Sequence, residues 1–197
     1  MKKYLFSKIH LIILISISLT LFAESNPKLP NLKNRVNTAQ IPWIKNVGQF
    51  NSNIAFTSKT FAADINVKNN RNIGYRIISN EGKVVYIEES FLNPVESDLL
   101  PKGLEKTQTK VNYFVGEKEN HHSGISTYNS VDLGEIWSGI NIKLSSGNKN
   151  IEKIFELKPD ADANEIRIEI KGAKDICENS DKELQVDLPS GEDICFT

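Results

Sequence analysis

Apolar and polar residues alternate along most of this sequence, and that period of two constrains the fold more than any other feature. In residues 166–171 every isoleucine falls on one side of an extended chain and every charged residue on the other. A strand of this kind buries one face and leaves the other in water. The same alternation recurs in residues 73–77, 111–115, 140–144 and 184–188.

Less regular runs fill the spaces between these strands, at residues 61–67, 83–91, 125–133 and 151–157. Turn-forming residues separate them, and no segment after residue 40 shows a sustained apolar stripe of helical period. The nearest, 95–104, contains Pro101 and Gly103, which favour a loop with at most one helical turn. The sequence therefore predicts an all-β fold, an antiparallel two-sheet β-sandwich-like domain of about ten or more short strands.

The first 23 residues differ from the rest. Lys2 and Lys3 precede an apolar run at 11–22, and Ala23 follows it. A basic start, an apolar run shorter than the roughly 20 residues that span a bilayer, and a small residue at the exit are typical of a cleavable signal peptide. We expect residues 1–23 to be this signal peptide, with cleavage near Ala23 or Ser25.

The rest of the chain then divides into two parts. Residues 24–40 are polar and aperiodic and are expected to form a flexible linker, and residues 41–197 are expected to form a single all-β domain. The protein is expected to be exported from a bacterial cytoplasm to the periplasm, the outer surface or the medium. No transmembrane anchor is expected after cleavage of the signal peptide.

Charge argues against one class of partner. The chain has 24 basic and 25 acidic residues, and the expected signal peptide contains three lysines and no acid. The exported part therefore has 21 basic residues against 25 acidic ones, a net charge of −4. Because a protein that neutralises phosphates needs clustered Lys and Arg, and here basic and acidic residues alternate, nucleic acid is not an expected partner.

Three stretches resemble a known family. Residues 43–50 look like its ENxGQ opening, and residues 110–116 are similar to its KxNYFxG strand. The third stretch, from Tyr128 to Ala173, looks like the family series YPGIDL, EYDF, PGADP and GA. On these motifs the chain resembles the N-terminal domain of unknown function of bacterial SBBP proteins, which are large surface or secreted chains that carry β-propeller repeats.

This resemblance implies a secreted or cell-surface setting at the head of a multidomain chain. It supplies no activity and no catalytic residue. The expected partners are downstream β-propeller repeats or another surface protein. The apolar run at 194–196 agrees with this expectation, because a strand there favours further strands beyond it, so we expect the chain to be the front piece of a larger protein.

The exported part offers few groups for catalysis. Its histidines, His121 and His122, are adjacent in an expected loop, and neither a metal site nor a Ser-His-Asp triad is expected from them. The sequence contains no nucleophile-elbow or phosphate-binding motif. We predict no cofactor and no enzymatic activity. A hydrolase that uses carboxylates dispersed along the sequence is the less favoured alternative.

Residues 160–165 place oxygen ligands at alternate positions, as the first half of a calcium loop does. The second half does not fit, because Glu165 stands where such a loop has glycine and Lys171 where it has a bidentate acid. We interpret the segment as a turn that leads into the strand at 166–171, and we predict no metal site.

Aromatic residues favour an alternative function in binding. Trp43, Tyr128 and Trp137 would form a sugar-stacking surface if they were exposed, whereas aromatic residues in strands more often belong to the core. Both interpretations stay open at this point. The prediction is a non-catalytic structural or interaction domain of an exported cell-surface protein, with a carbohydrate- or matrix-binding module as the alternative.

Cys177 and Cys195 are the two cysteines, and each ends an Asp-Ile-Cys triplet. An even number in an exported chain favours a disulfide. If the last strands form a simple meander, however, the two cysteines flank the strand at 184–188 and lie about two strand spacings of 4.8 Å apart, which is too far for a disulfide. A bridge between them is therefore possible but not assigned.

Overall fold

The computed structural model describes residues 15–16, 41–60, 63–147 and 150–196. Neighbouring strands run antiparallel in each pair, and short 3-10 turns occur at Lys118–Asn120 (η1) and Ala163–Glu165 (η2). The all-β, antiparallel fold that the alternation predicts is confirmed. Most of the signal-peptide and linker segments, residues 1–14 and 17–40, lie outside the described residues.

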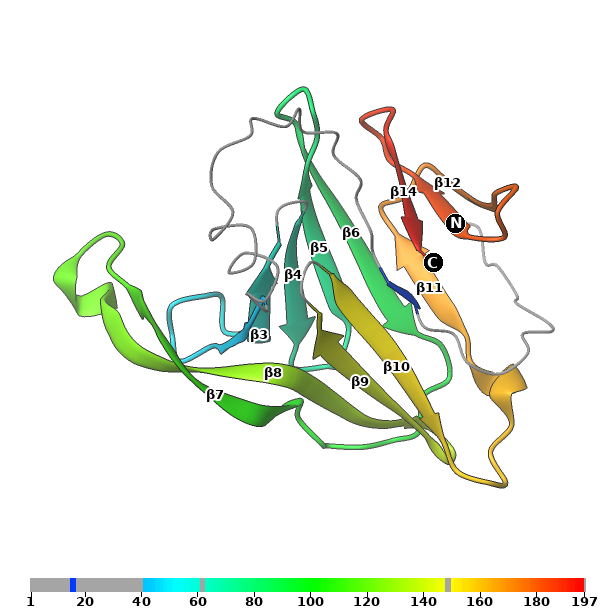
Figure 1. Ribbon diagram of the computed structural model, residues 1–197, viewed down its shortest axis with the longest axis horizontal. Coiled ribbons are helices and arrows are strands. Elements are labelled where there is room, and N and C mark those ends of the chain that lie inside the picture. Colours follow the sequence, from blue (N-terminus) through cyan, green and yellow to red (C-terminus); the bar gives the residue numbers. More distant parts are fainter. Residues whose placement is uncertain (1–14, 17–40, 61–62, 148–149, 197) are drawn as a thin grey trace, which may run out of the picture.

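One large sheet contains most of the strands (Figure 1). Its order is β1, β10, β9, β8, β2, β3, β4, β5, β6, β11, and β7 pairs with β8 beside this path. The strands span Ile15–Ser16 (β1), Trp43–Lys45 (β2), Ile54–Lys59 (β3), Ala63–Lys68 (β4), Ile73–Ile78 (β5), Val84–Phe91 (β6), Lys102–Tyr113 (β7), His122–Trp137 (β8), Ile140–Ser146 (β9), Ile151–Leu157 (β10) and Ile168–Lys171 (β11).

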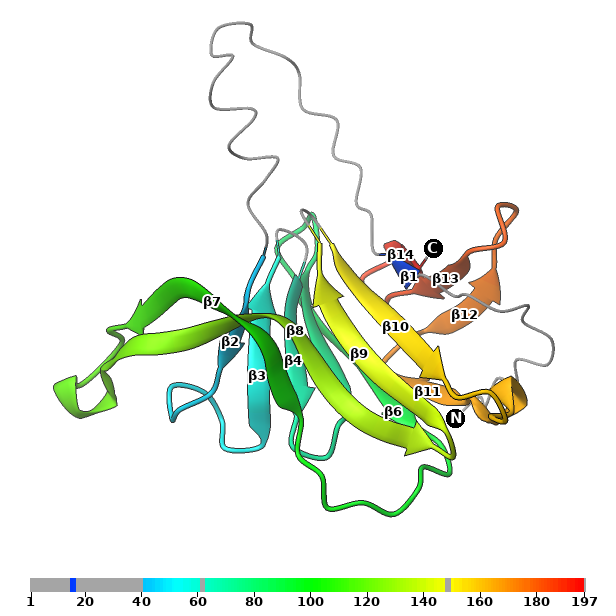
Figure 2. The ribbon, with the colours of Figure 1, turned by 60° about the horizontal axis from the view of Figure 1, so that its bottom comes forward.

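A second, small sheet has the order β12-β13-β14. Its strands are Asp175–Glu178 (β12), Leu184–Asp187 (β13) and Asp193–Phe196 (β14). Figure 2 shows it beside β10 and β11, at one side of the large sheet. Val186, Leu188 and Phe196 from this region join the same core as the large sheet.

Strand β8 connects the two halves of the large sheet. It is 16 residues long, pairs with β2 through Thr127 and Tyr128, and pairs with β9 from Ser130 onward. Its register against β9 shifts between Asp132 and Gly134, and Gly134 has a φ of +76°. Such a bulge bends a strand. The sheet therefore curls, and β9 and β10 come to face β5 and β6 across the core.

The core consists of the inward rows of this curled sheet. Alternate residues of β5 and β9 are buried, and so are Trp43, Phe91 and Trp137. The two-sheet sandwich expected from the sequence is not confirmed, because the main strands are hydrogen-bonded into one continuous sheet. Twist and the β8 bulge let one sheet cover its own apolar face, which has the same effect on burial as a second sheet.

Strand boundaries follow the alternation closely in some places and less closely in others. The run at 151–157 is β10 itself, whereas the strand expected at 166–171 begins only at Ile168, because η2 and its C-cap Ile166 precede it. The loop expected at 95–104 becomes strand β7 from Lys102.

The short strand β1 lies within the expected signal peptide. Ile15 pairs with Lys153 and Ser16 with Glu152, so β1 occupies the outer edge of β10. Within the described residues, no helix is both long and apolar enough to cross a membrane.

Candidate functional site

The loop between β2 and β3 is folded around the side chain of Asn46. Its Nδ2 donates to the carbonyl oxygens of Asn51 (2.9 Å) and Ile54 (2.8 Å). Its Oδ1 accepts from the backbone N–H groups of Gly48 (3.0 Å) and Phe50 (3.2 Å). A side-chain amide both donates and accepts, which a carboxylate does not do. Asn46 therefore fixes residues 46–54, which we call the Asn46 loop.

Gln49 and Gly48 complete the Asn46 loop. Gln49 accepts from Val47 N and donates to Lys45 O, each at 2.7 Å. Gly48 has a φ of +118°, and a Cβ there would lie 3.1 Å from the His122 ring. The Asn-Val-Gly-Gln sequence, which carries the family resemblance at the start of the domain, thus has a structural role in shaping this loop.

A groove of about 810 Å³ lies between the Asn46 loop and the start of β7. Tyr128 of β8 and Phe56 of β3 line it with rings packed edge to face, 5.7 Å between centroids. Gly103 of β7 passes directly over the Tyr128 ring, since an added Cβ would come within 2.5 Å of a ring carbon. A side chain at position 103 would therefore displace the Tyr128 ring.

The charged residues that line the groove are basic. Lys45 and Lys102 line it, and both are exposed. Among the described residues that line the groove there is no carboxylate and no imidazole. Rings, amides and lysines can hold a neutral or anionic ligand by stacking and hydrogen bonding. The acid and base that hydrolysis requires are missing from this lining.

The three aromatic residues singled out from the sequence do not form one exposed surface. Trp43 and Trp137 are 0% and 1% exposed and belong to the core. Trp137 packs edge to face on Phe91 and donates from Nε1 to the carbonyl of Leu92 at 2.8 Å. Tyr128 alone of the three is partly exposed, in the groove. The interpretation of these three rings as one sugar-stacking surface is therefore corrected, since only Tyr128 is accessible to a ligand.

Residues 43–195 match the family model described as Domain of unknown function (DUF7948). The chain belongs to the DUF7948 family. The matched region begins with Trp43 in β2 and ends with Cys195 in β14, so the DUF7948 domain comprises the large sheet from β2 onward and the small sheet. This confirms the sequence-based recognition of a domain of unknown function. No curated protein and no solved structure matches the chain.

The segment 160–165 forms a turn in the DUF7948 domain. The Asp162 side chain accepts from Asn164 N at 2.9 Å and caps η2. This backbone hydrogen bond, together with one from the Asn164 side chain, lowers the pKa of the Asp162 carboxyl. His121 approaches the carbonyl of Gly116 at 3.3 Å. Across the residues that the structure describes, no group of three or more His, Cys, Asp or Glu side chains is placed to hold a metal ion.

Sequence reasoning missed an ion pair inside the core. Lys153 of β10 contacts Glu89 of β6, and their side chains are only 6% and 2% exposed. Tyr75 Oη donates to Glu89 Oε1 at 3.1 Å. Burial, and then the charge and hydrogen bond of Glu89, raise the pKa of Tyr75 well above 10, so its hydroxyl remains a donor.

A signal for this pair is present in the alternation. Glu89 falls in the inward row of β6 with Val85, Ile87 and Phe91, and Lys153 falls in the inward row of β10 after Ile151. Each row thus contains one charged residue, and the two charges are opposite. Because a buried charge requires a partner, an acidic residue in one inward row and a basic residue in another predict an ion pair between the two strands.

Cys177 and Cys195 lie on the two outer strands of the small sheet. Both pair with Gln185 of β13, one from each side, so two strand spacings of about 4.8 Å separate them. That Cα separation exceeds the roughly 7 Å that a disulfide allows. Both are free thiols in the structure.

We expect denatured, non-reduced protein to contain two reactive thiols. In the folded protein Cys177 should react first, because it is exposed, whereas burial, followed by the charges of Asp193 and Glu183, raises the pKa of the Cys195 thiol. Titration with a thiol reagent, with and without denaturant, measures both quantities. Absence of reactive thiols from the denatured, non-reduced monomer would show a bridge and would contradict the strand register.

Proposed function

We propose that the DUF7948 domain is a non-catalytic interaction domain of an exported bacterial surface protein, and that the groove beside the Asn46 loop is its ligand site. The lining of the groove carries this proposal. It combines the partly exposed ring of Tyr128 with Lys45 and Lys102 and contains no acid–base pair among the described residues. Such a lining is suited to binding and poorly suited to hydrolysis.

The setting rests on the sequence. Residues 1–23 have the three parts of a signal peptide, and the motifs from residue 43 onward resemble the domain that precedes β-propeller repeats in SBBP proteins. The proposed partners are therefore repeats of this kind or another surface protein. The rigid Asn46 loop supports a preformed site, because its backbone is held by its own side chains before any ligand arrives.

Carbohydrate is the second candidate ligand, and the surroundings of Tyr128 favour it. Tyr128 lines the groove together with Lys45 and Lys102, which are exposed. A sugar bound in the groove would contact the exposed part of the Tyr128 ring, and its hydroxyl groups would accept hydrogen bonds from the ammonium groups of these two lysines.

Tyr128→Ala should weaken ligand binding about tenfold or more, the size of effect typical for truncating an aromatic anchor. Immobilised full chain would be tested against arrayed glycans and against purified β-propeller repeats of an SBBP protein. Tyr86→Ala is the matched control, because Tyr86 is 66% exposed on β6 and does not line the groove. Equal losses in both variants would reject the groove, and hydrolysis of an arrayed glycan would reject a non-catalytic domain.

A further inference from the structure

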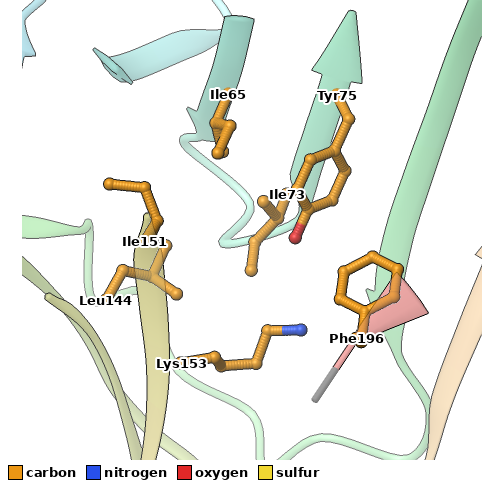
Figure 3. A pocket seen from close by; sticks show the side chains of 7 residues that line it. All are labelled: Ile65, Ile73, Tyr75, Leu144, Ile151, Lys153 and Phe196. Atoms are coloured by element: carbon orange, nitrogen blue, oxygen red, sulfur yellow. The ribbon is translucent and has the colours of Figure 1, made fainter. Parts of the chain in front are cut away.

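The ion pair between Lys153 and Glu89 lies in the core, and a third polar group, the Tyr75 hydroxyl, is hydrogen-bonded to the same carboxylate. Figure 3 shows the Lys153 side chain extending among Ile151, Ile73 and Phe196, with the Tyr75 hydroxyl directed toward the same space. One carboxylate oxygen of Glu89, Oε1, accepts from Tyr75, and the other, Oε2, contacts Lys153 Nζ. Amine, carboxyl and a hydroxyl donor are thus together in an apolar interior.

A second Lys–Glu pair on β6 offers a comparison within the same molecule. Lys68 contacts Glu88, the residue next to Glu89, on the opposite face of the strand. These two side chains are 27% and 29% exposed, and Glu88 also accepts from Asn72. Water reaches this pair, so both charges keep part of their hydration. The two pairs share their chemistry and differ in burial.

We propose that Lys153 and Glu89 are joined by an isopeptide bond. The Lys153 ammonium first transfers a proton to Glu89 Oε2, which gives an amine and a carboxylic acid. The Nζ lone pair then attacks Glu89 Cδ, so that the Nζ–Cδ bond forms. The bond from Cδ to Oε2 breaks, and a second amine proton leaves with that oxygen as water. One amide and one water result, and neither an oxidant nor a reductant takes part.

Each neighbouring group assists this condensation. In water the reaction is opposed because ammonium and carboxylate are well hydrated, whereas in an apolar interior both charges lose that hydration and a neutral amide is favoured. Tyr75 donates to Oε1, the oxygen that becomes the amide carbonyl, and so stabilises the negative charge that develops on it. A cavity of about 10 Å³ borders Lys153 and Tyr75, which is roughly the space that one water molecule needs.

The bond would tie the sheet across its curl. Lys153 and Glu89 are 64 residues apart in sequence, on strands β10 and β6. A cross-link of this kind limits the unfolded chain as a disulfide does. This role is independent of any ligand in the groove, and it gives an exported domain a covalent link that reducing conditions do not break.

Mass spectrometry of the denatured full chain tests the proposal. The expected result is a mass one water below that of the processed sequence, and a branched tryptic peptide that joins the segments containing Glu89 and Lys153, since trypsin does not cut after an acylated lysine. The peptide that ends at Lys68 should be released unlinked, as an internal control, and fragmentation of the branched peptide should place the link on Glu89 and not on the adjacent Glu88, which lies in the same tryptic peptide. A full mass, or a digest in which both segments are linear, would overturn the proposal.

Two variants separate this bond from other losses of water, such as cyclisation of an N-terminal Glu24 after cleavage. Lys153→Met should restore the missing water and remove the branched peptide. If that variant does not fold, the double variant Lys153→Met/Glu89→Met serves instead, because no charge stays buried in it. A loss of water that persists in these variants belongs to another site and would overturn the assignment.

Discussion

Replacing Lys153 with methionine is expected to lower the free energy of unfolding by at least about 3–5 kcal/mol, the range observed when one partner of a buried ion pair is removed, and loss of the proposed isopeptide bond would add to this decrease. Glu89 is 2% exposed and has its other oxygen bound to Tyr75, so its carboxylate would remain in an apolar interior with one hydrogen bond and no cation. Urea unfolding followed by circular dichroism measures the change.

Two control variants test whether this loss of stability comes from the unpaired buried charge of Glu89. Lys153→Met/Glu89→Met should be more stable than Lys153→Met, because it leaves no unpaired charge, and neither variant is able to form the isopeptide bond. Lys68→Met should change the free energy of unfolding by about 1 kcal/mol or less, since its ion pair with Glu88 is partly solvated. Equal stabilities of the single and double Lys153 variants would contradict the burial of Glu89.

Trp137→Ala is expected to lower the free energy of unfolding by about 3–5 kcal/mol, the usual cost of truncating a buried tryptophan. The variant loses the ring contact with Phe91 and leaves the carbonyl of Leu92 without its indole donor. The same urea titration checks it. Trp137→Phe is the matched variant and should lose less, because a ring still fills most of the space.

This experiment also decides between the two roles that the sequence allows for Trp137. A residue of the core affects stability, whereas a residue of a binding surface affects ligand affinity and leaves the unfolding midpoint nearly unchanged. If Trp137→Ala had a normal unfolding midpoint and impaired glycan binding, Trp137 would belong to a binding surface and not to the core. Tyr128→Ala should impair ligand binding, because Tyr128 lines the groove, and should lower the unfolding midpoint less than Trp137→Ala does, since its ring is only partly buried although it packs on Phe56 and under Gly103.

The local pattern predicted single strands well and their arrangement poorly. The run at 151–157 and the alternation at 140–144 correspond to β10 and β9, because one buried face leaves a clear period of two. The pairing of β8 with β2, β7 and β9 has no such signal. It depends on a bulge near Gly134 and on strands distant in sequence, so one curled sheet and a two-sheet sandwich have the same alternation.

The candidate site was predictable only in part for a related reason. Trp43 and Tyr128 are both aromatic residues in strands, and they are even paired with each other, yet one is buried and the other lines the groove. What separates them is the position of Gly103 and the Asn46 loop, which come from other parts of the chain. A groove assembled from several separate segments has no local sequence pattern by which it could be predicted.

Strand β1 covers the outer edge of β10 at Glu152 and Lys153, and it belongs to the segment expected to be removed on export. The exported domain would then present this edge to its neighbours, where open strand edges promote self-association. Two copies that joined antiparallel about Ile154 would place Glu152 of one opposite Glu156 of the other. Like charges directly opposite are unfavourable. In such a pair the alternate glutamates of β10 would therefore disfavour self-association at this edge.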